Sequence, residues 1–321
     1  MAEIGKDISR AKKTLEAGGL VAVPTETVYG LAGNGLDPGA VASIFEAKNR
    51  PSFDPLIIHV SSYLEIEKYV TVIPAQLGQL AERFWPGPLT LLLPRKSSIP
   101  DIVTSGLDRV AIRVPDHPLT LKLLAEVDFP LAAPSANPFG YISPTSPAHV
   151  EAQLGERVSY ILDGGKCKVG LESTIVGMEG EAVVIYRLGG LEISEIEDLV
   201  GPVVVKSHSS SNPQAPGLLE SHYAPTKPFF IGDLDELISK YLGQGVDFAV
   251  LSLDKSFSVL PFRNQIALSK SGDLKEAATH LFAAMRTLDE SNAEVILAEW
   301  MPEAGLGLAI NDRLRRAAAI G

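Results

Sequence analysis

The sequence is poor in cysteine, in basic residues and in long apolar runs, and each shortage excludes a class of protein. Cys167 is the only cysteine among 321 residues, so an internal disulfide and a cysteine-built zinc site are both excluded. No apolar run has the length of a membrane span, and Arg10, Lys12 and Lys13 interrupt the N-terminal region before any signal-peptide core. We therefore expect a cytoplasmic protein with no membrane partner.

Acidic residues outnumber basic ones, 39 against 28, which gives a formal net charge of -11. A protein that holds RNA through its phosphates normally has a basic excess. We therefore expect no stable nucleic-acid binding, although a local basic pocket for one nucleotide is compatible with this balance. A non-catalytic RNA-binding module stays as a disfavoured alternative.

The length of the chain suits two domains, and its composition marks the boundary between them. Residues 207–216 read Ser-His-Ser-Ser-Ser-Asn-Pro-Gln-Ala-Pro, which is typical of a linker. We predict a first domain at residues 1–206, a linker at residues 207–225 and a second domain at residues 226–321.

Strand-like and helix-like segments alternate on both sides of this linker, which predicts an α/β fold for both domains. In the first domain, helices are expected to start near Asp7 and Pro38, and strands are expected at residues 20–23, 56–60, 89–93, 110–114, 129–133, 173–176 and 183–187. In the second, strands are expected at residues 229–231 and 248–251, and helices at residues 234–242, 274–288 and 306–319. The second pattern is typical of a small parallel α/β domain.

Two of the predicted strands carry a polar side chain among apolar neighbours. His59 and Arg113 each lie on the opposite strand face from the flanking aliphatic residues. An arginine in such a strand either reaches solvent or meets an anion, because burying it unpaired is costly. A histidine there is either hydrogen-bonded within the core or part of a site. The strand pattern by itself leaves both alternatives open.

Three short polar segments also have a local explanation. Lys48 and Arg50 end a predicted helix, where cations are favourable against its negative pole. Residues 135–137, Ser-Ala-Asn, can form an N-cap turn, and residues 172–174, Glu-Ser-Thr, can be strand-edge polarity. Residues 164–167, Gly-Gly-Lys-Cys, lack the upstream glycine and the final hydroxyl residue of a P-loop, so any nucleotide site is of another kind.

Taken in chain order, these segments resemble the motifs of the threonylcarbamoyl-AMP synthases of the YrdC-like superfamily. The resemblance is carried by residues 24–31 (Pro-Thr-Glu-Thr-Val-Tyr-Gly-Leu), 48–51 (Lys-Asn-Arg-Pro), 85–90 (Trp-Pro-Gly-Pro-Leu-Thr), 110–115 (Val-Ala-Ile-Arg-Val-Pro), 134–137 (Pro-Ser-Ala-Asn), 143–145 (Ser-Pro-Thr) and 171–176 (Leu-Glu-Ser-Thr-Ile-Val). These motifs extend over nearly all of the first 206 residues. Residues 222–225, His-Tyr-Ala-Pro, and the tail at residues 305–318 resemble the long, two-domain form of this family.

This resemblance implies a fold and a reaction. The fold would be a twisted, open α/β sheet with a concave active-site face, followed by a smaller Rossmann-like α/β domain. The enzyme would be a nucleotidyltransferase that converts L-threonine, bicarbonate and ATP to threonylcarbamoyl-AMP and pyrophosphate. Mg²⁺ would accompany ATP without protein side chains as ligands, and the product would pass to the tRNA threonylcarbamoyl-transfer machinery.

The resemblance also implies roles for particular residues. The implied catalytic residues are Lys48, Arg50 and Arg113. The implied L-threonine site consists of Thr27, His59, Arg113, Ala133 and Ser173. The implied ATP site consists of Arg50, Asp54, Arg109, Ser135, Asn137, Ser143, Arg187, His222 and Tyr223. The segment with His222 and Tyr223 is expected to act as a lid over the nucleotide.

Other functions stay open beside this one. A regulatory nucleotide sensor would bind ATP without turnover, and serine would be an alternative amino acid, since it differs from threonine by one methyl group. Asp54 and Arg109 depart from the family pattern, which commonly has Asn and Thr there. A carboxylate at residue 54 would repel phosphates unless it is paired.

Overall fold

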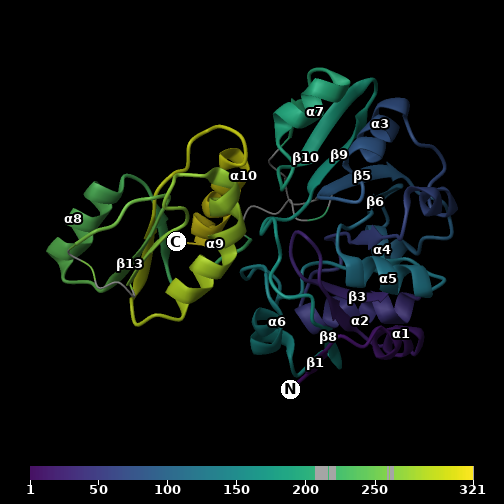
Figure 1. The fold of residues 1–321 in the computed structure, drawn as a ribbon, viewed down its shortest axis with the longest axis horizontal. Helices are drawn as coiled ribbons and strands as arrows, with labels where there is room; N and C mark the ends of the chain where they lie inside the picture. The colour runs from purple at the N-terminus through teal and green to yellow at the C-terminus, as the bar shows by residue number, and fades with distance from the viewer. Residues whose placement is uncertain (207–215, 217–221, 259, 261–263, 321) are drawn as a thin grey trace.

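The computed structural model describes residues 1–206, 216, 222–258, 260 and 264–320, and Figure 1 shows two α/β units. Of the linker predicted at residues 207–225, only residues 216 and 222–225 lie within the described part of the chain. The α/β fold class predicted for both units is confirmed.

The first unit is built on one mixed sheet. Among the described residues this sheet has 11 strands in the order β1-β8-β2-β3-β7-β4-β6-β5-β9-β10-β11. Their bounds are β1 Glu3–Gly5, β2 Val21–Val23, β3 Gly30–Asn34, β4 Ile57–His59, β5 Leu89–Pro94, β6 Arg109–Arg113, β7 Leu131–Ala132, β8 Tyr160–Leu162, β9 Thr174–Glu179, β10 Ala182–Arg187 and β11 Val204–Val205.

Helices connect and cover these strands. They are α1 Ile8–Glu16, α2 Pro38–Lys48, the 3₁₀ helix η1 Tyr63–Lys68, α3 Ala75–Phe84, α4 Asp101–Thr104, α5 Pro118–Glu126, α6 Pro147–Leu154 and α7 Ile193–Val200. Helix α2 shows how the sequence fixes such an element. Asp37 caps its first turn by accepting from the Gly39 N–H, Pro38 occupies the first turn, and Asn49 ends the helix at a φ of 52°. The helix therefore ends where Lys48 and Arg50 can turn toward the sheet.

The register of two central strands places the two anomalous polar residues side by side. Strands β4 and β6 are parallel, and His59 is paired in register with Arg113. Both residues end their strands, so their side chains lie at the same edge and on the same face of the sheet. Both side chains are buried, which excludes the alternative in which Arg113 reaches solvent.

The second unit has a four-stranded sheet in the order β12-β15-β13-β14 within the described residues, and every pair in it is parallel. Its elements are β12 Phe229–Ile231, α8 Leu234–Gln244, β13 Phe248–Ser252, β14 Gln265–Ala267, α9 Leu274–Asp289, β15 Val295–Ala298, α10 Gly307–Ala317 and the 3₁₀ helix η3 Ala318–Ile320. The predicted small parallel α/β domain is confirmed. Among the described residues, no helix has both the length and the apolar character of a bilayer span.

Helices α9 and α10 lie on the side of the second unit that faces the first (Figure 1). Val28 and Leu171 of the first unit belong to the same buried apolar cluster as Leu281 and Phe282 of α9. The contact is close at Gly170, which has a φ of +78°, and a Cβ atom there would lie 2.5 Å from the Ala278 carbonyl oxygen. The two units therefore share a packed apolar interface.

Asp289 at the end of α9 accepts several hydrogen bonds at this interface. Its carboxylate accepts hydrogen bonds from the Thr226 and Lys227 N–H groups at 2.9 and 3.1 Å and from the Thr226 hydroxyl at 2.8 Å. It also accepts one from the Tyr141 hydroxyl of the first unit at 2.6 Å. These donors are partly buried and would lose their acceptor together in Asp289→Ala.

We expect Asp289→Ala to lower the free energy of unfolding by about 2–4 kcal/mol, measured by urea denaturation, because several donors are left unpaired. Asp198→Ala on the exposed face of α7 is the control, and its effect should stay within about 0.5 kcal/mol. Equal losses in both variants would contradict the role given to Asp289.

Candidate functional site

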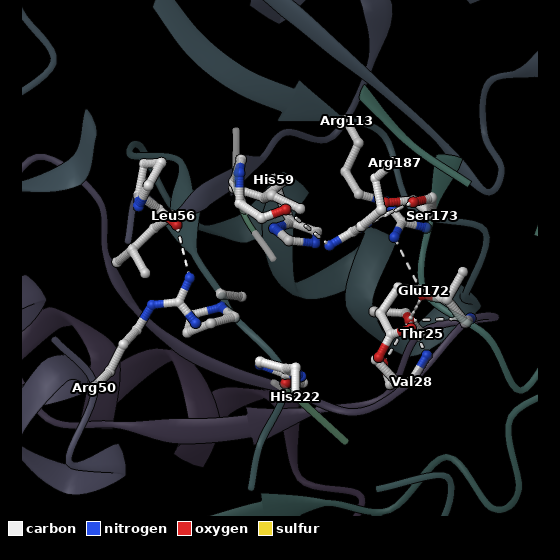
Figure 2. A pocket seen from close by; sticks show the side chains of 18 of the residues that line it. Thr25, Val28, Arg50, Leu56, His59, Arg113, Glu172, Ser173, Arg187 and His222 are labelled. Carbon is white, nitrogen blue, oxygen red and sulfur yellow. Dashed lines mark hydrogen bonds between the residues drawn. The ribbon is translucent and has the colours of Figure 1, made fainter. Parts of the chain in front are cut away.

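A pocket opens at the edge of the first sheet, where the ends of several strands meet loops of the first unit and the segment between the two units. The empty space inside the pocket and at its mouth, open solvent included, is about 570 Å³. Figure 2 shows the lining side chains, with Arg50 and Arg187 entering from different sides. The lining consists of Thr25, Thr27, Val28, Gly30, Arg50, Pro55, Leu56, Ile57, His59, Arg113, Ala133, Pro134, Ser135, Glu172, Ser173, Arg187, Pro216, His222 and Tyr223.

Arg113 is held at the end of β6 by a buried carboxylate. One of its terminal nitrogens donates to Glu26 Oε1 and, at 3.2 Å, to the Gly87 carbonyl oxygen. The other donates to Thr27 Oγ1 at 3.1 Å. Burial lowers the pKa of Arg113, and the Glu26 carboxylate opposes this shift. Among the described residues, nothing accepts a hydrogen bond from its buried Nε, so one donor of the guanidinium is unsatisfied within the protein.

His59 lies beside Arg113 as a neutral imidazole. Burial, reinforced by the charge of Arg113, lowers the pKa of His59 to about 3. Its Nδ1 is buried without a hydrogen-bond partner among the described residues. This side chain can therefore orient a ligand by one hydrogen bond, but it adds no charge at neutral pH.

Hydroxyl groups line the wall between these strands. Thr25 Oγ1 lies 2.7 Å from Thr27 Oγ1, and Thr90 Oγ1 lies 2.7 Å from Ser173 Oγ. Arg187 at the end of β10 donates to the Ser173 carbonyl oxygen at 2.8 and 3.1 Å and to Ser173 Oγ at 3.0 Å. Burial lowers the pKa of Arg187 to about 10, so it remains a cation at neutral pH.

A second cationic group comes from the end of α2. The Lys48 Nζ donates to the carbonyl oxygens of Ser135 and Asn137. Arg50 bonds the Asp54 carboxylate at 2.9 Å and the Asp54 and Pro55 carbonyl oxygens at 3.0 and 2.8 Å. The sequence analysis expected Asp54 to repel phosphates unless it is paired. Arg50 provides that pairing and neutralises the carboxylate.

His222 and Tyr223 return from the segment between the two units and close one side of the pocket. The His222 ring packs edge-on against Phe139 and Tyr223, with centroids 5.7 and 4.2 Å away. Burial, followed by the charge of Arg316 and then of Arg50, lowers the pKa of His222 well below its ordinary value. Tyr223 has a φ of 65° and packs at 5.4 Å on Phe282 of α9.

Most of the residues expected at the site are brought together here. Those that line the pocket are Thr27, Arg50, His59, Arg113, Ala133, Ser135, Ser173, Arg187, His222 and Tyr223. Four others lie outside the lining and bond to residues of it: Lys48, Asp54, Asn137 and Ser143. Arg109 lies outside the lining, at the start of β6, where it donates to the Tyr186 hydroxyl at 2.9 Å.

Three polar residues of the site escaped the sequence analysis as individual site residues. Thr25 and Glu172 line the pocket, and Glu26 lies outside the lining as the partner of Arg113. All three are buried and belong to motifs that the analysis had marked, at residues 24–31 and 171–176. Glu26 and Glu172 are the carboxylates that neutralise buried arginines. The signal that would have found them is electrostatic, since a buried Arg113 requires an anion somewhere in the same motifs.

The fold and the pocket define an α/β protein with a polar pocket, in which arginines and hydroxyl groups meet a neutral histidine. Comparison of the chain with known proteins then identifies a family with this fold. A family model described as "Telomere recombination" matches residues 13–189, and one described as "Threonylcarbamoyl-AMP synthase, C-terminal domain" matches residues 191–319.

Similar proteins agree over both units. The chain is 41% identical to a threonylcarbamoyl-AMP synthase of Pyrococcus abyssi, over 94% of this chain and 91% of that protein. It is 40% identical to one of Bacillus subtilis, over 97% and 92%. A crystal structure of P. abyssi Sua5 complexed with L-threonine superposes with a TM-score of 0.92 at 39% identity, covering 99% of this chain and 97% of that one. The chain belongs to the threonylcarbamoyl-AMP synthase family.

The neutral state of His59 predicts a dependence of stability on pH. Its pKa is about 3 in the folded state, against about 6.5 in the unfolded state, so on acidification the unfolded state binds the proton first. The contribution of His59 to the free energy of unfolding is therefore highest above about pH 6.5 and falls as the pH is lowered toward 3. Between pH 7 and pH 5, wild type should therefore lose about 2 kcal/mol more than His59→Gln, measured by urea denaturation. Equal losses would show that His59 is not held neutral.

Proposed function

We propose that this chain is an L-threonylcarbamoyladenylate synthase that converts L-threonine, bicarbonate and ATP to threonylcarbamoyl-AMP and pyrophosphate. The observation that carries this proposal is the buried guanidinium of Arg113, whose Nε has no acceptor among the described residues. It points to an amino-acid carboxylate in the same cavity that Arg50 and Arg187 line on other sides.

The amino-acid half of the cavity fits a small hydroxylated substrate. Arg113 would hold the carboxylate, while the Thr27 and Ser173 hydroxyls and the His59 imidazole would hydrogen-bond the remaining polar groups. Ala133 leaves room beside them. One methyl group is worth about 1–3 kcal/mol in a pocket, so threonine would be favoured over serine by roughly 10–200-fold.

The nucleotide half needs positioning and charge neutralisation. The threonine amine and bicarbonate give a carbamate and water, and a carbamate oxygen then attacks the α-phosphorus while the bond to pyrophosphate breaks. Arg50, Arg187 and Ser135 line the pocket and would hold the phosphates in line for this displacement. Lys48, Asn137 and Ser143 would support these groups from behind the lining. Because carbamates lose carbon dioxide readily in water, the closing segment at His222 and Tyr223 would also protect the intermediate.

The metal expected with ATP fits this site as a partner of the phosphates. Among the described residues, no three His, Cys, Asp or Glu side chains are grouped to hold an ion. The carboxylates of Asp54 and Glu172 are engaged by arginines. Mg²⁺ would therefore be held chiefly by phosphate oxygens, where it neutralises charge. We further propose that the enzyme works in the cytoplasm and delivers its adenylate to the tRNA threonylcarbamoyl-transfer machinery.

Pyrophosphate release tests this function. With ATP, Mg²⁺ and bicarbonate, release should require L-threonine, and Arg113→Ala should lower kcat/KM for threonine at least about 100-fold, which is about 2.7 kcal/mol. The control is Arg10→Ala, which removes an exposed guanidinium paired with Glu3. ATP binding without threonine-dependent release would favour a nucleotide sensor, and RNA binding without ATP affinity would favour an RNA-binding module.

The variant Glu26→Gln tests whether threonine binding and ATP binding depend on different parts of the cavity. Its carboxylate holds Arg113 and accepts from the Asp116 N–H at 2.9 Å, so its loss should disturb the threonine end. We expect the KM for L-threonine to rise about tenfold or more, because the buried guanidinium loses its counter-charge, while the KM for ATP stays within about threefold. Glu179→Gln in an exposed pair with Lys206 is the control. An equal rise in both KM values would contradict this assignment.

A further inference from the structure

A carboxylate stands where the nucleotide phosphates are expected. Glu172 lines the pocket beside Ser173 and Arg187 (Figure 2), and its side chain is buried. An uncompensated carboxylate at this position would repel a polyphosphate chain. The pocket therefore requires a cation that pairs with Glu172. In the first unit, Ser143 donates a hydrogen bond to it and the charge of Arg187 acts on it, but among the described residues of that unit none forms a salt bridge with it.

The neutralising group comes from the second unit. Arg313 on α10 places its Nε and one terminal nitrogen each 3.1 Å from Glu172 Oε2, across 141 positions of sequence. Ser143 donates to the other oxygen, Oε1, at 2.6 Å. Arg313 is 0% exposed, which makes it the largest fully buried side chain among the described residues. Both oxygens of Glu172 are thus fixed from opposite sides.

The surroundings of this pair favour an ionised carboxylate. Burial alone would raise the pKa of Glu172, but Arg313, Arg187 and the Ser143 hydroxyl together bring it below its ordinary value. Arg313 is itself supported by Asp312 at 2.9 Å, and its guanidinium lies 5.3 Å from the ring centroid of Tyr223. Helix α10 therefore contacts the pocket lining at two points, Glu172 and Tyr223.

We propose that Arg313 is a positioning residue of the nucleotide pocket, contributed by the second domain. It holds and neutralises Glu172, so that the adjoining Arg187 faces the ligand without a competing anion. The second domain then supports the pocket from behind its lining, through Glu172. The proposal rests on the proposed function for the identity of the ligand, a nucleotide polyphosphate.

The test compares charge-dependent with charge-independent binding in full-length protein. Calorimetric titration would give the Kd of ATP with Mg²⁺ and of adenosine, which lacks phosphates, for wild type, Arg313→Met, Glu172→Gln and the double variant. Arg313→Met should raise the Kd of ATP at least tenfold, because Glu172 is left buried without its partner, while the Kd of adenosine changes less than threefold. The double variant should return the Kd of ATP to within threefold of wild type.

Arg315→Met is the matched control, because Arg315 is exposed on the same helix and packs on Trp300 at 5.8 Å. An unchanged Kd of ATP in Arg313→Met, equal losses for ATP and adenosine, or no recovery in the double variant would each overturn the inference. If Arg313→Met does not fold, as judged by thermal denaturation, Glu172→Gln alone decides. Its Kd for ATP should equal or fall below that of wild type, and a tenfold rise would overturn the inference. Failure of wild type itself to bind ATP would overturn the proposed function instead.

Discussion

A buried guanidinium group needs hydrogen-bond acceptors and, for three of the arginines in and around this pocket, a carboxylate, and this constraint organises much of the pocket. Arg113 is buried at the end of β6 because Glu26, from the loop before β3, reaches it. Arg50 is buried because Asp54, four residues further along the chain, pairs with it, and Arg313 is buried because Glu172 pairs with it. In each pair the carboxylate lies in a segment without regular structure, because Glu26, Asp54 and Glu172 are all outside the helices and strands. The loops around the pocket are thus fixed by charge pairing as much as by apolar packing.

The same pairing explains how two separate sheets can build one site. Apolar packing of α9 on the first unit forms a shared buried cluster, but such packing has no directional preference. Hydrogen bonds to Asp289 and the contact of Arg313 with Glu172 are directional, and they fix where α9 and α10 lie against the pocket. Tyr223, between the two units, packs on α9 and lies against Arg313. The position of the closing segment is therefore set from both sides.

Much of this arrangement could be predicted from the sequence. The rest could not, and the reasons are physical. The alternation of apolar residues predicted β4, β6 and β13, because these strands are buried and rich in aliphatic residues. Strand β3, Gly-Leu-Ala-Gly-Asn, was missed, since its low β-propensity is overcome only by pairing with β2 and β7. The motifs predicted most of the pocket residues, but pairings such as Glu172 with Arg313 span 141 positions and leave no local pattern.

The strand pattern left two alternatives for Arg113, and burial decides between them, because solvent is out of reach. The pocket nevertheless does not satisfy this arginine fully: among the described residues, Nε of Arg113 and Nδ1 of His59 both lack a partner. Buried polar groups without partners are costly, and folds keep them where a ligand supplies the missing bonds. The two orphaned atoms belong to residues paired in register on adjacent parallel strands. The sheet itself therefore sets the spacing at which a substrate carboxylate would be received.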